Sequence, residues 1–535
     1  MKIGTRLCTR LALALLLTVS GIGTAGAQLY GSIDTAPLNV KQFGAKGDGA
    51  ADDTAILNKA LASGSAIVFP PGTYIVAPPT PSASAKILTV FPGQTITGYG
   101  GATIKIKNGA GIYETIMYGA LVPGFSCEGM TFDHNQANNN IGAANAAAAG
   151  NAAVTGRRAT FELGGANLRL VGNTTNNGQG VQDYFIGTGG AGDSVRAYIV
   201  GNRWLAMGDN PQHFDYDNST LYVTGSEPLI QGNYFQADFT KWARSAIETH
   251  ATQQNVSNNT VVGYRILANI TGASSVEDSL NSIVAGNIGK TMITGINLAS
   301  FKVSPHTTGF GLRNFQVVDN EITILQATYA STVAASGTNG ILFDFNSDLP
   351  VENVKIARNK IWFESEASDP GNVGSALSAG ISCYMNAPAA LTFKNISIVG
   401  NEIYNAPVRG IQILANINGL TIDDNLLINP GQTKIAGINN GNKTGMYLYF
   451  RNIAGRTMIR RNRIIDDYAT TRLLSGVFCF GVTGIAPTPE FHDNVIEAQG
   501  DGVSLKTLRN IDLTAACSGV FDKNDAHYTN TRPAQ

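Results

Sequence analysis

A short phrase, a hydrophobic residue followed three positions later by an asparagine, recurs along most of this chain. Clear copies end at Asn173, Asn202, Asn233, Asn287, Asn320, Asn359, Asn401, Asn425, Asn462 and Asn494, and weaker ones at Asn135 and Asn259. From Asn135 to Asn494 is 359 residues over eleven steps, so the mean period is about 33 residues. Such periods are typical of solenoids and propellers. Because β-branched residues alternate with polar ones around each asparagine, the repeating units are predicted to be strands.

The asparagine has a physical reason to recur. It tolerates the left-handed backbone conformation that a tight corner between two strands requires. Its amide both donates and accepts, so asparagines stacked one coil apart can form a continuous hydrogen-bonded ladder. We therefore expect these residues to lie in one column.

A glycine followed by an apolar residue forms the second recurring element. Copies begin at Gly295, Gly340, Gly380, Gly410, Gly445, Gly476 and Gly502. We expect each glycine to make a corner and the next residue to begin an inward-facing strand position. An asparagine corner, a short strand, a glycine corner and another short strand make one coil of a parallel β-helix. The alternative is an ordinary β-protein rich in asparagine and glycine.

Composition limits the partners. A solenoid lengthens without closing a core, so 535 residues fit one long domain. Charged residues make up 14% of the chain and the net charge is -1, so no basic face is predicted to bind nucleic acid.

The first residues predict export. Lys2, Arg6 and Arg10 precede an apolar run, and Ala25-Gly26-Ala27 resembles a cleavage site, which predicts a signal peptide at 1–27. A membrane anchor is the alternative, but the apolar run is too short to span a bilayer. The mature protein is therefore expected in the periplasm or outside the cell, without a membrane partner.

Four cysteines follow the predicted signal peptide, and their spacings match no metal motif. Cys383 and Cys479 follow glycine corners three coils apart, roughly 14 Å, which exceeds disulfide reach. Both are predicted to be reduced core residues, and no cofactor is expected.

One passage resembles a known family. The segment from Asn39 to Thr54, and its continuation through Ala55–Leu61 and Val68–Tyr74, resembles the opening of the pectate-lyase-3-like superfamily. That group covers rhamnogalacturonase-, polygalacturonase- and epimerase-like proteins. The resemblance implies a single-stranded, right-handed parallel β-helix that acts on polysaccharides, but it does not fix the reaction.

The same segment predicts a capping helix. Asp52 or Asp53 can cap it, and Ile56, Leu57, Ala60 and Leu61 share one face that can cover the first coil. The predicted organisation is a signal peptide at 1–27, a cap with the first coils at 28–110, β-helix repeats at 111–507 and a C-terminal tail or cap at 508–535.

A candidate catalytic cluster follows from strand alternation. In Ala246–His250, Ile247 and Thr249 are predicted to point inward, so Glu248 and His250 point outward. The preceding coil is expected to contribute Asp215 beside Glu248, and Asp217 beside His250. The next two coils are expected to contribute Asn269, beside His250, and then Asn297.

These residue types suit glycan cleavage. Two neighbouring carboxylates can serve as the acid and base of a glycosidase, with His250 tuning them or acting as a base. Lys241, Arg244 and Arg265 could bind or neutralise a uronate carboxylate, as β-elimination requires.

Aromatic side chains are candidates for binding sugars. Trp242 could stack on a sugar face. Tyr384 and Tyr447, with Tyr449, Phe478 and Phe480, could form a second stacking surface, but for the two phenylalanines cover by the C-terminal tail from Leu508 onward is the preferred explanation. Asp423-Asp424 and Asp466-Asp467 are expected to be solvated turns, with calcium as the alternative.

The sequence therefore predicts a secreted enzyme that degrades a polysaccharide, by hydrolysis at Asp215 and Glu248 or by β-elimination. Two alternatives stay open: a non-catalytic, adhesive glycan-binding solenoid and a depolymerase of the phage-tail type.

Overall fold

The computed structural model describes residues 36–139, 157–178, 182–187, 196–208, 218–238, 241, 243–272, 279–300, 311–325, 338–345, 351–364, 378–385, 392–431, 443–467, 475–481, 489–498, 509–513, 520–522 and 525–528. All the elements below belong to one compact unit, Pro37–Gln535. The predicted signal peptide, 1–27, lies outside the described residues. No helix in the described part of the chain combines the length and apolar character needed to cross a bilayer.

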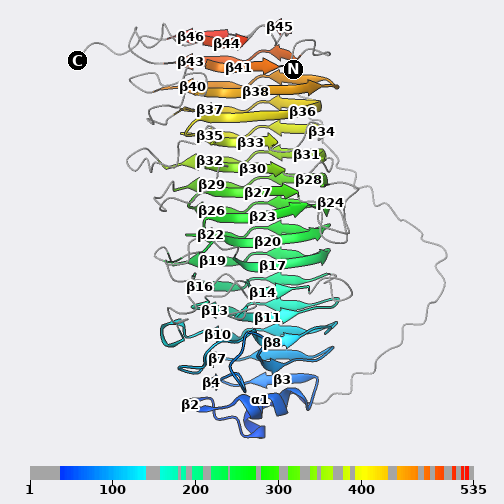
Figure 1. Cartoon of the computed structure of the whole chain (residues 1–535), viewed down its shortest axis with the longest axis vertical. Coiled ribbons are helices and arrows are strands. Elements are labelled where there is room, and N and C mark those ends of the chain that lie inside the picture. Colours follow the sequence, from blue (N-terminus) through cyan, green and yellow to red (C-terminus); the bar gives the residue numbers. More distant parts are fainter. Residues whose placement is uncertain are drawn as a thin grey trace, which may run out of the picture. The chain divides into compact units, whose positions relative to one another are not determined.

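The chain winds into coils of three short strands each, and each strand pairs in parallel with its counterparts in the neighbouring coils (Figure 1). One coil consists of β20 (Ser245–Thr252), β21 (Asn255–Ser257) and β22 (Thr260–Val262), after which β23 (Ile266–Gly272) pairs with β20. This is the predicted right-handed parallel β-helix. It has three faces, which we number in the order of β20, β21 and β22.

Face 1 carries the strands on which the candidate site lies. Its strands are β5 (Lys86–Thr89), β8 (Thr115–Gly119), β11 (Ala159–Leu163), β14 (Gln182–Ile186), β17 (Ser219–Ser226), β20, β23, β27 (Thr294–Ser300), β30 (Asn339–Phe345), β33 (Ala379–Met385), the first part of β36 (Arg409–Asp423), β38 (Thr444–Ile453), β41 (Ser475–Gly481) and β44 (Arg509–Leu513).

Faces 2 and 3 complete the coils. The strands of face 2 are β1 (Leu38–Asn39), β3 (Ala66–Phe69), β6 (Thr95–Gly98), β9 (Ser126–Glu128), β12 (Arg169–Val171), β15 (Tyr198–Val200), β18 (Leu229–Gln231), β21, β24 (Ser279–Leu280), β25 (Ile283–Ala285), β28 (Leu312–Val318), β31 (Val351–Ala357), β34 (Thr392–Val399), the second part of β36, β39 (Thr457–Arg460), β42 (Glu490–His492) and β45 (Val520–Asp522). The strands of face 3 are β2 (Asp48–Asp52), β4 (Gly72–Val76), β7 (Ala102–Ile106), β10 (Thr131–Asp133), β13 (Thr174–Asn176), β16 (Arg203–Met207), β19 (Tyr234–Ala237), β22, β26 (Ile288–Thr291), β29 (Glu321–Ile324), β32 (Lys360–Phe363), β35 (Glu402–Tyr404), β37 (Leu426–Ile428), β40 (Arg463–Asp466), β43 (Val495–Ala498) and β46 (Asp525–Tyr528).

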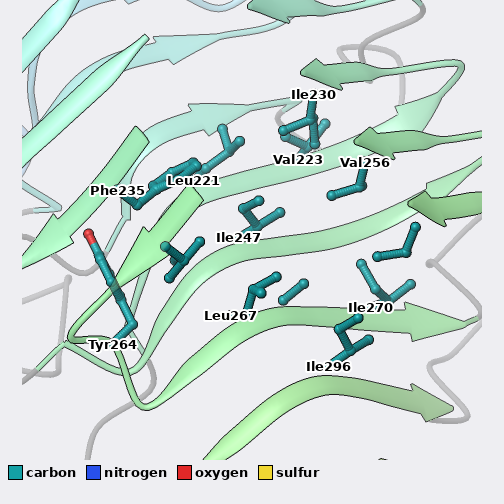
Figure 2. Packing of buried hydrophobic residues seen from close by; sticks show 14 of the residues in the cluster. Leu221, Val223, Ile230, Phe235, Ile247, Val256, Tyr264, Leu267, Ile270 and Ile296 are labelled. Atoms are coloured by element: carbon teal, nitrogen blue, oxygen red, sulfur yellow. The ribbon is translucent and has the colours of Figure 1, made fainter. Parts of the chain in front are cut away.

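The core is a set of columns that run from coil to coil. Leu221, Ile247, Ala268 and Ile296 occupy one register position on β17, β20, β23 and β27, and all four are fully buried. Figure 2 shows Leu221, Ile247 and Ile296 pointing into the interior from neighbouring strands. Since side chains alternate along a strand, the residues next to these inward residues on each strand must face outward.

The predicted asparagine ladder is confirmed at the corner between faces 2 and 3. Each Nδ2 donates to the Oδ1 of the next asparagine at 2.9–3.2 Å. The same Oδ1 also accepts from a backbone N–H, as Asn287 Oδ1 does from Asn259 at 3.0 Å. Its members, each no more than 1% exposed, are Asn173, Asn202, Asn233, Asn259, Asn287, Asn320, Asn359, Asn401, Asn425, Asn462 and Asn494.

Two details of the expected corner were wrong. The left-handed residue is not the ladder asparagine but the residue before it, as at Gly201 (φ 66°) and Asn258 (φ 55°). The backbone must reverse before the amide enters the interior, so the asparagine itself is free of this requirement. Asn135 is left-handed (φ 53°) but stands outside the ladder, where its Nδ2 donates to Ile106 and Asn108.

The predicted glycine corners were also wrong. Gly295, Gly340, Gly380, Gly410 and Gly445 lie inside strands of face 1, and none of them has a left-handed φ. A Cβ at Gly340 would lie 2.4 Å from Ile361 Cγ2 and 2.6 Å from the carbonyl oxygen of Gly380. Glycine recurs here because neighbouring coils leave no space for a side chain. Gly476 lies within β41, and Gly502 is outside the described residues.

The N-terminal segment forms η1 (Val40–Phe43) and α1 (Thr54–Leu61), and Figure 1 shows α1 beside the first strands of the stack. Asp52 Oδ1 accepts the Thr54 N–H at 3.1 Å, whereas Asp53 accepts from the backbone of Lys46 and Gly47. The expected apolar face is confirmed: Leu57, Ala60 and Leu61 are buried, and Ile56 packs against the core. Farther along, η2 (Gln136–Asn138) follows β10.

Two predictions for the C-terminal part need correction. The repeats were expected to end at 507 and to be followed by a tail or cap at 508–535, but β44, β45 and β46 pair with β41, β42 and β43 and add a further coil. Cys479 was expected to be reduced, but it is disulfide-bonded. Cys127 and Cys383 are free and buried.

We predict that Asn287→Ala lowers the free energy of unfolding by about 2–5 kcal/mol. The substitution removes the acceptor of the Asn259 N–H and the donor to the Val256 carbonyl, both at buried sites. Denaturant unfolding would measure the loss. The control is Asn314→Gly in an exposed row of amides, where glycine accepts the left-handed backbone (φ 54°) and water can replace the lost bond to Asn281; equal losses would contradict the role given to the buried ladder.

We also predict that Gly340→Ala destabilises the protein by about 1–3 kcal/mol, because the added methyl group overlaps Ile361 and the backbone of Gly380. Gly201→Asn is the control, since nothing lies within 4 Å of a Cβ there and Asn258 occupies the equivalent corner. Thermal unfolding would compare the two. A larger loss at Gly201 would show that corner conformation, and not packing, determines the glycine positions.

Candidate functional site

One outward residue from each coil of face 1 forms a continuous line, which we call the central column. Successive Cα partners define it through β5 to β44. Its members are Thr89, Tyr118, Glu162, Phe185, Tyr222, Glu248, Asn269, Asn297, Leu342, Ser382, Gln412, Tyr447 and Phe478, and the backbone of Asp512 occupies the same register position on β44. Neighbouring members are about 4.8 Å apart at the backbone.

Glu248 and His250 point outward from β20 as predicted. Glu248 is 5% exposed, and its Oε1 lies 3.0 Å from His250 Nε2. The expected carboxylate partner was wrong, because the register places Tyr222 beside Glu248. The distance in sequence between the Asn202 corner and the next strand of face 1 is longer than assumed, so β17 begins at Ser219. Asp215 and Asp217 precede β17 and lie outside the described residues.

The two amides of the column follow Glu248. Asn269 pairs in register with Glu248, and not with His250 as expected, because β23 is shifted by two positions from the assumed alignment. Asn297 follows on β27 as predicted and donates Nδ2 to Asn269 Oδ1 at 3.0 Å. These contacts bring Glu248, Asn269 and Asn297 together on three successive coils.

The predicted basic residues lie at the corner that leads into face 1. The backbones of Arg244 and Arg265 stack on adjacent coils, since the N–H of Ile266 donates to the Arg244 carbonyl at 2.8 Å. Lys241 Nζ lies 3.4 Å from Asp238 Oδ2 and also donates to Gln136. The Lys241 charge is thus partly neutralised. Trp242 lies outside the described residues.

A second carboxyl group on the column was missed by the sequence analysis. Glu162 lies between Tyr118 and Phe185, is 9% exposed, and its buried Oε2 has no hydrogen-bond partner in the described part of the protein. Burial raises the pKa of Glu162, and the nearby Glu114 carboxylate raises it further. Lys86 and Arg157 act in the opposite direction on the pKa but do not cancel the effect.

The Glu114 carboxylate, unlike the Glu162 carboxyl group, forms an ion pair. Arg157 Nε lies 3.3 Å from Glu114 Oε1, and the same guanidinium stands 3.9 Å from the Phe185 ring centre and donates to Gln182. The two carboxyl groups therefore occupy contrasting environments, one desolvated and one paired with a cation. The alternation in Ala159–Leu163 could have revealed Glu162, but that strand carries no glycine marker and precedes the first clear asparagine phrase.

The aromatic side chains stack on one another along the helix axis. Phe185 and Tyr222 have ring centres 5.3 Å apart, and Tyr222 and His250 have centres 5.0 Å apart. Farther along, the Arg409 guanidinium from the preceding coil lies 3.6 Å from the Tyr447 ring centre. The Phe478 ring from the following coil stacks on Tyr447, with the two ring centres 5.4 Å apart.

This stacking contradicts the expected sugar platform at Tyr447, because both ring faces are already covered and only the ring edge and hydroxyl remain. Tyr384 pairs with Leu414, two positions along β33 and β36 from the central column, and its side chain lies outside the described part of the structure. Burial lowers the pKa of Arg409 to about 10, so this guanidinium stays charged at neutral pH.

The acidic turns are not simply solvated. Arg460 Nε lies 2.8 Å from Asp423 Oδ2, and Arg461 pairs with both Asp423 and Asp424. Asp466 is fully buried. Within the described ranges, no group of three or more His, Cys, Asp and Glu side chains is placed to hold a metal ion. The calcium alternative gains no site from these residues.

The chemistry available on face 1 is acid–base chemistry at carboxyl groups. A desolvated Glu162 keeps its proton to a higher pH than an ordinary glutamate, and Arg157 forms an ion pair with the neighbouring Glu114 carboxylate. Two carboxyl groups in such different surroundings can serve as a proton donor and its partner carboxylate. Glu248 and His250, both on β20, lie three coils farther along, at a backbone separation from Glu162 of about 14 Å.

Comparisons with known proteins agree with the fold. Residues 38–109 match the family model described as rhamnogalacturonase A/epimerase, pectate lyase-like, which confirms the resemblance of the N-terminal segment. A probable glucan endo-1,3-beta-glucosidase of Arthroderma benhamiae is 49% identical over 55 residues, and the match covers 8% of this chain and 6% of that protein. The chain thus matches only a small part of that relative.

Solved structures share the architecture over most of the chain. A mutant tailspike protein of E. coli bacteriophage HK620 in complex with a hexasaccharide aligns with a TM-score of 0.61 and 14% identity, covering 92% of this chain and 80% of that one. The tailspike protein in complex with a pentasaccharide aligns with a TM-score of 0.59, 14% identity and the same two coverages. At this identity, the likeness shows the shared parallel β-helix fold.

We predict that Glu162→Gln stabilises the protein at neutral pH. Between the ordinary pKa of glutamate and the raised pKa of Glu162, the folded state binds more protons than the unfolded state, so stability falls as pH rises. Glutamine cannot ionise, so the advantage of the variant should grow as pH rises from 4 to 8 and vanish in acid. Urea unfolding at several pH values would show it, with the exposed Glu227→Gln as control. Parallel stability curves would contradict the buried-acid assignment.

Proposed function

We propose that this protein is a secreted polysaccharide hydrolase whose substrate lies along the central column, with Glu162 as the general acid and Glu114 as the ionised partner carboxylate. One observation carries the assignment: a buried carboxyl group with a raised pKa, Glu162, interacts with a second carboxyl group, Glu114, that is paired with Arg157. Glycosidases use two carboxyl groups in these two roles.

The comparisons support glycan as the substrate class. The N-terminal segment matches a pectate-lyase-like family model, the partial relative is named a glucan endo-1,3-beta-glucosidase, and the tailspike structures hold oligosaccharides. Secretion rests on the N-terminal sequence alone. We extend these properties to this chain as part of the proposal.

In the proposed reaction, Glu162 gives its proton to the glycosidic oxygen as the bond from that oxygen to the anomeric carbon breaks. Glu114 accepts a proton from the water molecule that attacks the anomeric carbon, and the water oxygen becomes the hydroxyl group of the new reducing end. Proton exchange with solvent then restores both carboxyl groups. Arg157 orients the Glu114 carboxylate through their ion pair, and the contacts of Arg157 with Phe185 and Gln182 hold the guanidinium in place. The partly exposed edges of Tyr118 and Tyr222 can contact the sugars on either side.

A second candidate is β-elimination on a uronate polymer, favoured by the contact between His250 and Glu248. If His250 Nε2–H donates to Glu248, then Nδ1 is the unprotonated nitrogen and can remove a proton from the sugar. This reaction produces an unsaturated uronate that absorbs ultraviolet light, whereas hydrolysis produces only reducing ends. A non-catalytic adhesive protein or tailspike-like binder would produce neither.

We predict that Glu162→Gln and Glu114→Gln each lower turnover by about 10²–10⁴-fold on a polysaccharide that the wild type cleaves, since loss of a general acid or base has this effect. A panel with β-1,3-glucan and polygalacturonate would be assayed for reducing ends and for ultraviolet absorbance. Glu227→Gln, exposed and paired with Arg196, is the matched control and should keep full activity.

Full activity in both variants would exclude this carboxyl pair. An ultraviolet-absorbing product that disappears in His250→Asn would replace hydrolysis by elimination. Binding of a polysaccharide without any product would favour the alternative of a non-catalytic glycan-binding protein.

A further inference from the structure

We infer that the central column from Asn269 to Gln412 is a glycan subsite for neutral sugars, which it recognises through hydroxyl and amide groups. The inference rests on the proposed function in taking a glycan as the ligand, and it adds the class of sugar. Between Glu248 and Asp512, every member of the column is uncharged: Asn269, Asn297, Leu342, Ser382, Gln412, Tyr447 and Phe478.

Several polar atoms along this stretch have no hydrogen-bond partner among the described residues. Ser382 and Gln412 are fully buried neighbours on β33 and β36, and within the described part of the chain Ser382 Oγ, Gln412 Oε1 and Gln412 Nε2 make no hydrogen bond. Asn297 Oδ1 is likewise buried and unbonded. The three side chains point outward from the same column, so the unbonded atoms face one side of one sheet.

Leaving such atoms unbonded is costly, at about 1–3 kcal/mol for each buried group. The ladder asparagines show that this fold can satisfy buried amides fully, since Asn287 Nδ2 alone makes two hydrogen bonds. Gln412 makes none, although leucine would fill similar space without this cost. A polar group retained at such a position is expected to bond with something other than the protein.

The donor set indicates the ligand. An amide supplies both donors and an acceptor, and a serine hydroxyl supplies one of each, which matches sugar hydroxyl or acetamido groups and offers no charge to a carboxylate. Apolar Leu342 and the edge of Tyr447 border these groups, as is common in ligand sites. The nearest cation, Arg409, is stacked on Tyr447. A uronate polymer would find no basic side chain in the column itself.

The subsite is remote from the proposed acid. Glu162 and Gln412 are eight coils apart on the column, about 38 Å at the backbone. Asn297 and Tyr447, on either side of the buried stretch, are partly exposed, so a long chain can approach from both ends. Only a long glycan would therefore reach both places.

The experiment measures binding directly by calorimetry, with Glu162→Gln protein to prevent turnover. The ligands are soluble neutral glycans, including β-1,3-glucan, and the polyuronates polygalacturonate and alginate. The tightest ligand is then tested with the same protein carrying Gln412→Leu or Ser382→Ala. Gln236→Leu, an exposed outward glutamine on face 3, is the matched control.

We expect a neutral glycan to bind most tightly, with an affinity that hardly changes between about 0.05 and 0.5 M salt. Gln412→Leu and Ser382→Ala should each weaken binding by roughly tenfold or more while the midpoint of thermal unfolding stays constant or rises, because no hydrogen bond within the protein is lost. Gln236→Leu should change neither. A purely structural role would instead lower the unfolding midpoint and leave affinity unchanged.

The inference is overturned if a polyuronate binds most tightly, if nothing in the panel binds, or if both substitutions leave the affinity unchanged, which would mean that only water occupies the site. These outcomes are distinct from failure of the proposed reaction, which is judged from product formation by the Glu162 and Glu114 variants. A neutral preference that depends on Gln412 stands even if another residue is the acid.

Discussion

The interaction on which this structure depends is the bond from one ladder asparagine to the next. Each amide bonds to a side chain and a backbone group of neighbouring coils, so a coil cannot shift along its strands without breaking several buried hydrogen bonds at once. Parallel pairing alone would permit a change of register, and a shift by one residue would turn every inward side chain outward. The ladder fixes the register, and the apolar columns of the interior then pack between coils.

A fixed register makes each face a set of straight columns, and the central column turns residues distant in sequence into neighbours. Glu162 and Phe185 are 23 positions apart in the chain, and Asn297 and Leu342 are 45 apart, yet each pair is adjacent on the sheet. Chemistry can therefore be concentrated at one end of face 1, where carboxyl groups and cations gather, while uncharged amides and hydroxyls occupy the middle. The scaffold is uniform, and the side chains of this one column distinguish its parts.

The sequence predicted the architecture because the features that hold coils together repeat. Asn287 and its counterparts could be recognised since each serves the same bonds, and Glu248 could be placed outward because Ile247 and Thr249 alternate with it. What varies from coil to coil could not be predicted. The number of residues between a corner and the next strand of face 1 differs, so Tyr222 and not Asp215 stands beside Glu248. Glycines at a corner and glycines under a neighbouring coil look alike in sequence, and only the contacts of Gly340 tell them apart. Glu162 was missed because its strand lacks both recurring markers.

The constant distance between coils has a consequence for recognition. The spacing of outward residues along face 1 is set by backbone geometry, whereas the spacing of sugar units along a polymer is set by its own linkage. Where these two spacings differ, a sugar unit lies directly over an outward residue only at intervals along face 1. Hydrogen bonds between the polymer and face 1 are then expected only at a few well-separated coils. Adding or deleting a single coil between Glu162 and Gln412 would change the spacing of sugar units that can bind at both residues, without altering either side chain.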